Sequence, residues 1–386
     1  MRLLISYDGY IFKLNGKYYF SELDEILLMR YLRVFDNIIL VLRTKEVNFL
    51  DPFYSIPLND ARIEVYEVPM FQGPIEYAKV YFKVRKVIKR ASKKADMGIF
   101  RLPSTVGTIA CNFIKNSGKP YLVEVVANPY ETVVKVKCFI ISVLMKIIHK
   151  SLVANCKKAK GVAYVTKKQL PDIYPANDYA ITEFYSSVEL NKDYFFNERN
   201  FPQERPFKII HIANNITQSD SKGIVTALHV IGELVKNGLD VSIVFVGERK
   251  IANLFDNIAK EIGITDRVNF VGRKTKKELR ELLIKSDLLL FPSRSEGLPR
   301  VIIEANALSL PCVASDVGGI RELLEDDVLF DVDDYKGMAN KITEIFSNKE
   351  LYEHLCKVNF ENAKLFESSI LNKKRDKFYS ALLTKS

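Results

Sequence analysis

Apolar runs and amphipathic stretches alternate most regularly in the second half of the chain. Short apolar runs typical of buried strands lie at residues 207–213, 241–247, 268–272, 286–293, 311–316 and 328–330. Stretches with apolar positions at helical spacing lie between them, for example at 222–238 and 274–287. Short buried strands separated by helices predict βαβ units and therefore a parallel, doubly wound sheet.

The first half repeats this pattern more loosely. Strand-like runs lie at 2–6, 37–43, 97–104, 119–126 and 161–166, and an amphipathic stretch at 20–35. The polar stretch 189–206 interrupts the alternation and is the best candidate for a linker. We therefore predict an α/β protein of two Rossmann-like, doubly wound domains that face each other across a ligand-binding cleft. The expected parts are an N-terminal domain over 1–190, a linker over 191–206, a C-terminal domain over 207–365 and a helix over 366–386 that packs back on the N-terminal domain.

Composition agrees with two ordinary globular domains. The chain has 386 residues, of which 48% are hydrophobic and 27% charged. Its five cysteines are scattered singly, which favours a reducing compartment and argues against disulfides or a zinc site. The start MRLLISYDGY resembles a strand rather than a signal peptide, and no apolar run reaches the roughly 18 residues of a spanning helix. We expect a cytoplasmic protein.

The net positive charge of the chain is confined to the first half. Residues 1–200 carry 30 basic and 20 acidic side chains, whereas residues 201–386 carry 27 of each. The basic residues concentrate in two amphipathic stretches, 81–96 and 135–160. A basic face beside apolar residues suits an anionic membrane surface or nucleic acid, and each stretch alone is equally well explained as a solvated helix face. Two such stretches in one half favour surface binding, and we expect membrane rather than nucleic acid.

Two glutamates stand out around a turn in the second half. The segment SRSEGLP (293–299) follows an expected strand and precedes an expected helix, so its free N–H groups suit an anion. Glu296 lies in this turn, where Gly297 would allow close approach of a ligand. Glu304 lies in the helix among apolar residues, where it could accept hydrogen bonds from vicinal hydroxyls. The alternative is an ion pair between Glu304 and Arg300, one turn earlier.

This segment resembles a known family. EGLPRVIIE (296–304), a glutamate followed by seven residues and another glutamate, is similar to the signature of retaining glycosyltransferases of family 4, which have the GT-B fold. The neighbouring segments match the same family. They are FPSRSEGLP before the signature, EANALSLPCVASDVGGIREL from Glu304 onward, Lys222-Gly223 at a helix start, and FVG at 245–247 and 270–272. The resemblance covers residues 207–330. More weakly, RLPS (101–104), VEVVANPYE (123–131) and VAYVTKKQLPDIYP (162–175) resemble members that build bacterial surface polysaccharides.

The resemblance implies a role for each matching residue. Glu304 would hold the nucleotide ribose, Glu296 the hydroxyls of the donor sugar, and Lys222 the diphosphate, whose charge grows in the transition state. The remaining donor-binding candidates are Gly297, Leu298, Ser293, Gly247, Arg273 and Asn214. The donor would be a UDP- or GDP-linked sugar, with no further cofactor.

Two departures from the family pattern concern the donor phosphates and the first loop. Ala213-Asn214 stands where the family has Gly-Arg, so half of its cationic clamp is missing. Asn214 could donate a hydrogen bond without charge, and Arg273 or Arg294 could replace the arginine. The family's glycine-rich N-terminal loop is replaced by SYDGYIFKLNGKYYF (6–20).

The acceptor side offers fewer candidates. None of the four histidines suits a general base, and His211, at the end of a core-like strand, is expected to be structural. Arg101, Glu124 and Asn128, at strand ends, are candidate acceptor contacts. The acidic run 325–334 is best explained as a solvated loop, and we expect no catalytic metal.

The expected function is that of a retaining, metal-independent glycosyltransferase. Its acceptor would be lipid-linked or an oligosaccharide, in the synthesis of capsule, O-antigen or exopolysaccharide, and the enzyme would be peripheral at the inner face of the plasma membrane. The alternatives are a sugar-nucleotide epimerase, a glycosyltransferase with a soluble acceptor, and a non-catalytic basic binding protein.

Overall fold

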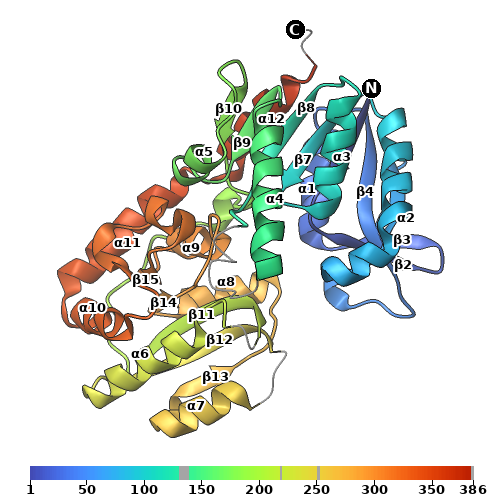
Figure 1. Ribbon diagram of the computed structural model, residues 1–386. Coiled ribbons are helices and arrows are strands. Elements are labelled where there is room, and N and C mark those ends of the chain that lie inside the picture. The colour runs from blue at the N-terminus through green and yellow to red at the C-terminus, as the bar shows by residue number, and fades with distance from the viewer. Residues whose placement is uncertain (130–138, 218–219, 250–252, 384–386) are drawn as a thin grey trace. The chain divides into compact units, whose positions relative to one another are not determined.

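The chain forms two compact units. The computed structural model describes residues 1–129, 139–217, 220–249 and 253–383 (Figure 1). Unit 1 consists of Met1–Tyr185 together with Asn372–Ser386, and unit 2 of Ser186–Leu371. The chain therefore passes from one unit to the other twice, after Tyr185 and after Leu371.

Unit 1 is built on a mostly parallel sheet. Its parallel strands lie in the order β10 (Ile181–Phe184), β9 (Gly161–Tyr164), β8 (Tyr121–Val125), β7 (Met97–Leu102), β1 (Arg2–Ser6), β4 (Asn37–Glu46), and β6 (Ile63–Pro69) also pairs with β4. β2 (Tyr10–Leu14) pairs with the second half of β4, and β3 (Lys17–Phe20) and β5 (Ile56–Pro57) extend it antiparallel. The stretch 6–20, which replaces the glycine-rich loop of the resembled family, thus contains the β-hairpin of β2 and β3.

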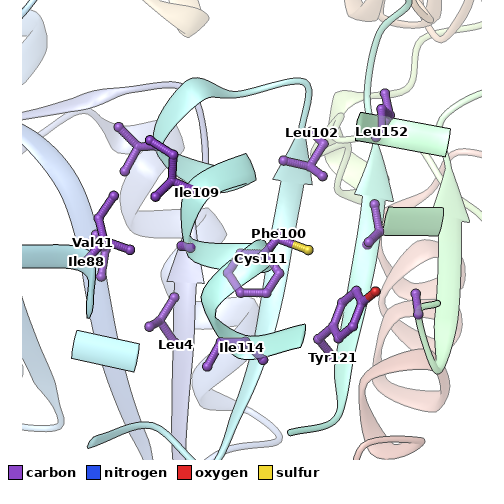
Figure 2. Close-up of a cluster of buried hydrophobic side chains, with 14 of the residues drawn as sticks. Leu4, Val41, Ile88, Phe100, Leu102, Ile109, Cys111, Ile114, Tyr121 and Leu152 are labelled. Carbon is purple, nitrogen blue, oxygen red and sulfur yellow. The ribbon is translucent and has the colours of Figure 1, made fainter. Parts of the chain in front are cut away.

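Helices cover the unit 1 sheet. They are α1 (Glu22–Leu32), α2 (Gly73–Lys94), α3 (Thr105–Asn116), α4 (Phe139–Cys156) and α5 (Gln169–Ile173). Ile88 of α2, Ile114 of α3 and Leu152 of α4 are buried in one apolar core with side chains of the strands (Figure 2). Lys119 fixes the end of α2, because its Nζ donates to the carbonyls of Ser92 and Ala95, which are left unpaired at a helix C-terminus.

Unit 2 has the regular alternation that its sequence predicts. Its parallel strands lie in the order β13 (Val268–Phe270), β12 (Val241–Arg249), β11 (Phe207–Ile216), β14 (Leu288–Phe291), β15 (Cys312–Ser315), β16 (Leu329–Phe330). The helices are α6 (Ile224–Lys236), α7 (Leu254–Ile262), α8 (Lys276–Lys285), α9 (Arg300–Asn306), α10 (Tyr335–Ser347), α11 (Lys349–Lys364) and the start of α12 (Ser368–Ser380). The rest of α12 belongs to unit 1.

The stretch 191–206, expected to be a linker, is built into unit 2. Arg199 accounts for much of this, because its guanidinium donates to the carbonyls of Leu283 and Leu308, at 3.0 and 3.2 Å. Leu283 lies in the last turn of α8, where carbonyls lack the i+4 N–H partner of the helix interior. The polar composition of this stretch therefore does not make it a loose linker, because the guanidinium of Arg199 caps the C-terminus of α8.

None of the helices in the described part of the chain is long and apolar enough to cross a membrane.

Candidate functional site

A carboxylate, a lysine and a serine meet at the end of β14 in unit 2. Glu296 Oε1 accepts hydrogen bonds from Lys222 Nζ at 2.5 Å and from Ser293 Oγ at 2.6 Å. Ser293 is fully buried two residues after β14, and Lys222 lies just before α6. Three residues picked from the sequence, up to 74 positions apart, are thus brought into direct contact. The charges of Lys222 and Glu296 compensate each other, yet both side chains remain partly accessible.

Glycines allow the loops at this edge to approach so closely. Gly223 has φ +70°, and a Cβ there would lie 1.9 Å from the Pro292 carbonyl oxygen. Gly318 has φ +58°, and its Cβ would lie 2.0 Å from the carbonyl oxygen of Glu296. The Gly319 N–H also donates to Gly297 O at 2.6 Å. Any side chain at these glycines would push the Glu296 turn away from its neighbours.

The next strands place two more candidates near this edge. Gly247, at φ +150°, packs so closely on β11 that a Cβ would lie 1.7 Å from the Ala213 carbonyl oxygen. Its N–H donates to Gly272 O at 3.0 Å, and the exposed Arg273 follows directly. Asn214 lies in β11, but its side chain is outside the described part of the structure. Leu298 is partly exposed in the Glu296 turn.

Glu304 lies in the second turn of α9 without the ion pair that its sequence allows. Among the described residues, no salt bridge joins it to Arg300 or to any other cation, so the i,i+4 alternative is not found. Burial raises the pKa of Glu304, and the charges of Arg300 and Lys276 oppose that rise only in part. Glu304 is partly exposed, and a partly desolvated carboxylate that lacks a partner is a candidate for contact with a ligand.

Two neighbouring side chains have structural tasks. Arg294, considered above as a replacement for the missing clamp arginine, donates to Asp333 at 2.7 Å and lies 3.7 Å from Asp220. Its charge is therefore already compensated. His211 is buried, its Nδ1 lies 2.9 Å from Leu290 O, and burial lowers its pKa to about 4, so it is neutral at pH 7.

In unit 1 the predicted acceptor contacts belong to a buried network. Glu124 is 2% exposed, and Arg101 Nη1 donates to its Oε2 at 2.8 Å. Tyr31 donates to the same oxygen at 3.0 Å, while Tyr185 and Tyr379 each donate to Oε1 at 2.7 Å. Burial opposes the charge of Glu124, but Arg101 and the tyrosines hold its pKa below the usual value.

Glu124 therefore has no free oxygen for an acceptor, and the prediction that it contacts one is not supported. Asn128 is likewise engaged, since its Oδ1 accepts from the Tyr174 hydroxyl at 2.8 Å. No local pattern in the sequence points to the tyrosines of the network, because Tyr379, for example, is 255 positions from Glu124.

No group of three or more His, Cys, Asp or Glu side chains within the described ranges is placed to hold a metal ion. In the acidic run 325–334, Asp326 forms a salt bridge with Arg321 at 2.6 Å.

Sequence comparisons find relatives along the whole chain. Residues 196–360 match the family model of glycosyl transferases group 1. Protein CapJ of Staphylococcus aureus is 28% identical over 396 residues, which cover 99% of this chain and 98% of CapJ. The O-antigen chain mannosyltransferase RfbU of Salmonella typhimurium is 26% identical over 217 residues, covering 54% of this chain and 56% of RfbU.

Several solved structures are similar in fold to this chain over nearly its whole length. Sucrose-phosphate synthase from Thermosynechococcus elongatus gives a TM-score of 0.73 at 15% identity, over 99% of this chain and 98% of that one. HepE of Anabaena, solved in complex with UDP, gives 0.67 at 15% identity, over 99% and 100%. The fold is that of GT-B glycosyltransferases, as the sequence predicts, and the matches together support a glycosyltransferase.

Proposed function

We propose that the protein is a retaining, metal-independent glycosyltransferase. It moves a sugar from a UDP- or GDP-linked donor to a lipid-linked or oligosaccharide acceptor in the synthesis of a surface polysaccharide. The observation that carries the proposal is the contact of Lys222, Ser293 and Glu296 at the sheet edge of unit 2. The O-antigen relative RfbU and the UDP complex of HepE support the substrate classes.

The geometry suggests how the two charges are used. In the free protein Lys222 Nζ and Glu296 Oε1 satisfy each other at 2.5 Å. A bound nucleotide sugar would bring its diphosphate to Lys222 and its sugar hydroxyls to Glu296. In the transfer step the bond from the anomeric carbon to the diphosphate oxygen breaks, and the acceptor hydroxyl oxygen bonds to that carbon on the same face. The acceptor proton passes to the leaving phosphate oxygen, whose growing negative charge Lys222 stabilises.

Transfer assays with radiolabelled UDP- and GDP-sugars test this function. We expect Lys222→Ala and Glu296→Gln each to lower kcat by about 100-fold or more, because each removes a group that acts on the reacting centre. Lys236→Ala is the matched control, since that lysine is 75% exposed and bears only a 3.8 Å pair with Glu233. Unchanged turnover in both site variants would refute the assignment, and an inverted product anomer would refute retention. Epimerised donor without transfer would identify an epimerase.

The membrane surface is proposed as the partner of α2. This helix carries eight basic residues and one acidic residue, and on its exposed side stand Lys79, Lys83 and Lys86. Ile75, one turn before Lys79, and Phe82, one turn before Lys86, are 75% and 84% exposed. Exposed apolar side chains among lysines suit a surface with anionic head groups above hydrocarbon, where each cation contributes about 1 kcal/mol. Residues 135–138 of the second basic stretch lie outside the described part.

Vesicle sedimentation tests this partner separately from catalysis. The protein should bind phosphatidylglycerol vesicles at low salt and lose most of this binding at about 0.5 M salt, because salt screens surface charges. It should not bind phosphatidylcholine vesicles, which carry no net charge. Absence of binding to the anionic vesicles would remove the membrane proposal and leave the glycosyltransferase proposal intact.

A further inference from the structure

The first segment of unit 2 is fastened onto α8. Lys276 Nζ donates to the Glu189 carbonyl at 3.0 Å. Arg280 donates through Nε to Tyr194 O and through Nη2 to Asp193 O, both at 3.2 Å, and its guanidinium lies 5.5 Å from the centre of the Tyr194 ring. These contacts fix the short turn Lys192–Tyr194 on the surface of α8.

The same segment is bound to the end of α9, the helix of Glu304. The N–H of Phe196 donates to Ala307 O at 2.9 Å, and Ser309 Oγ donates to Phe196 O at 2.9 Å. Tyr194 is two residues before Phe196, and Glu304 is about one turn before Ala307, so the two side chains come from adjoining stretches. In agreement, burial and then the charge of Glu304 raise the pKa of Tyr194.

The hydroxyl of Tyr194 and the carboxylate of Glu304 have no hydrogen-bond partner among the described residues. Tyr194 is 8% exposed. Glu304 is partly exposed, so a ligand can reach this carboxylate. A partly desolvated hydroxyl or carboxylate without a hydrogen-bond partner costs free energy that a ligand's hydroxyl groups would recover. A tyrosine hydroxyl can donate and accept, and a carboxylate accepts twice, which together suit a vicinal diol.

We propose that Tyr194 is a second diol-binding residue beside Glu304, so that the segment Glu189–Phe196 contributes to the nucleotide site of unit 2. The ligand class is a ribonucleoside diphosphate, whose 2′- and 3′-hydroxyls meet the Tyr194 hydroxyl and the Glu304 carboxylate. This inference rests on the proposed function, in which Glu304 holds the nucleotide ribose. It adds a residue outside the resemblance at 207–330, from a stretch expected to connect domains.

Calorimetric titration of the full-length protein with UDP, GDP and their 2′,3′-dideoxy forms, which lack both ribose hydroxyls, tests this proposal. For whichever ribonucleotide binds, Tyr194→Phe should weaken affinity about fivefold to tenfold, the loss of one neutral hydrogen bond. The same substitution should change affinity for the dideoxy form less than twofold, because the hydrogen-bonding partner of Tyr194 is then absent from the ligand. Wild-type preference for ribose over dideoxyribose should therefore shrink in the variant.

Tyr352→Phe is the matched control, because its hydroxyl donates to Asp287 O at 3.1 Å within unit 2. It should lower stability and leave nucleotide affinity unchanged. An unaltered ribose preference in Tyr194→Phe would overturn the role of Tyr194 alone. If the wild-type protein bound neither UDP nor GDP, the nucleotide-sugar function would fall, and this inference with it.

Discussion

The network around Glu124 makes a quantitative prediction for Tyr379→Phe. The substitution removes one hydroxyl and leaves the ring, which packs 5.0 Å from that of Tyr31. The lost bond is 2.7 Å long and ends on a carboxylate that is 2% exposed. A hydrogen bond to a charged group contributes about 1.5–3 kcal/mol, and Glu124 keeps three other donors. We therefore expect unit 1 to lose about 2 kcal/mol of unfolding free energy.

The neighbouring substitutions should follow a definite order. Tyr185→Phe should cost a similar amount, because its bond to the same oxygen has the same length. The double variant with Tyr379→Phe should cost more than the two single changes added, since Glu124 Oε1 is then left without either donor. Glu124→Gln should cost the most, about 3–5 kcal/mol, because it leaves the charge of Arg101, which is only 15% exposed, without a counter-ion.

Urea unfolding followed by far-UV circular dichroism measures these changes, with Tyr179→Phe as the control. Tyr179 is 97% exposed, so its variant should differ from wild type by less than about 0.5 kcal/mol. The pKa of Glu124 is lowered in the folded protein. Its contribution is therefore complete above the unfolded carboxyl pKa of about 4.3 and is lost as pH falls through the folded value. A Tyr379→Phe variant as stable as the Tyr179→Phe control would refute this account of the network.

Three further predictions concern other parts of the chain. Gly223→Ala should abolish binding of the nucleotide in calorimetry or prevent folding, because the added methyl group would lie 1.9 Å from Pro292 O, and wild-type affinity would contradict the close contact. Arg199→Ala should lower the stability of unit 2 by about 2–3 kcal/mol in urea, since the α8 carbonyls lose their cap, whereas Arg199→Lys should restore only part of it. Phe82→Ser should leave stability within about 0.5 kcal/mol and weaken sedimentation with anionic vesicles about tenfold, and equal binding would exclude insertion of this ring.

Local patterns were sufficient for most of unit 2. Its strands are short and buried, so each apolar run between helices marks a strand, and the observed β11 and β12 extend the expected runs by two or three residues. The contact among Lys222, Ser293 and Glu296 follows from the same regularity, since parallel strands end at one edge of the sheet. The position of these three residues in the sequence motif was therefore sufficient to predict that they meet.

Contacts between segments that are distant in the sequence could not be predicted from it. Tyr379 and Tyr185 approach Glu124 from 255 and 61 positions away, and a buried carboxylate gives no sign of which hydroxyls will reach it. In the stretch 191–206, expected to be a linker, the sequence likewise did not reveal that the polar Arg199 bonds to helix carbonyls. The hairpin at 6–20 was missed because its short strands pair with β4, whose position is set by the rest of the sheet.

The return of the last residues to unit 1 sets an order of events during synthesis. When Tyr185 leaves the ribosome, Glu124 and Arg101 are present, but Tyr379 has not been made. At about 5–20 residues per second, the intervening chain takes roughly 10 to 40 s to translate. We expect unit 2, which is one continuous segment, to fold first. Until Tyr379 is made, residues 1–185 remain incompletely folded, because Glu124 lacks one of its hydrogen-bond donors. A nascent chain arrested after Leu371 should accordingly be cleaved by protease within residues 1–185 and resist cleavage in the segment that follows.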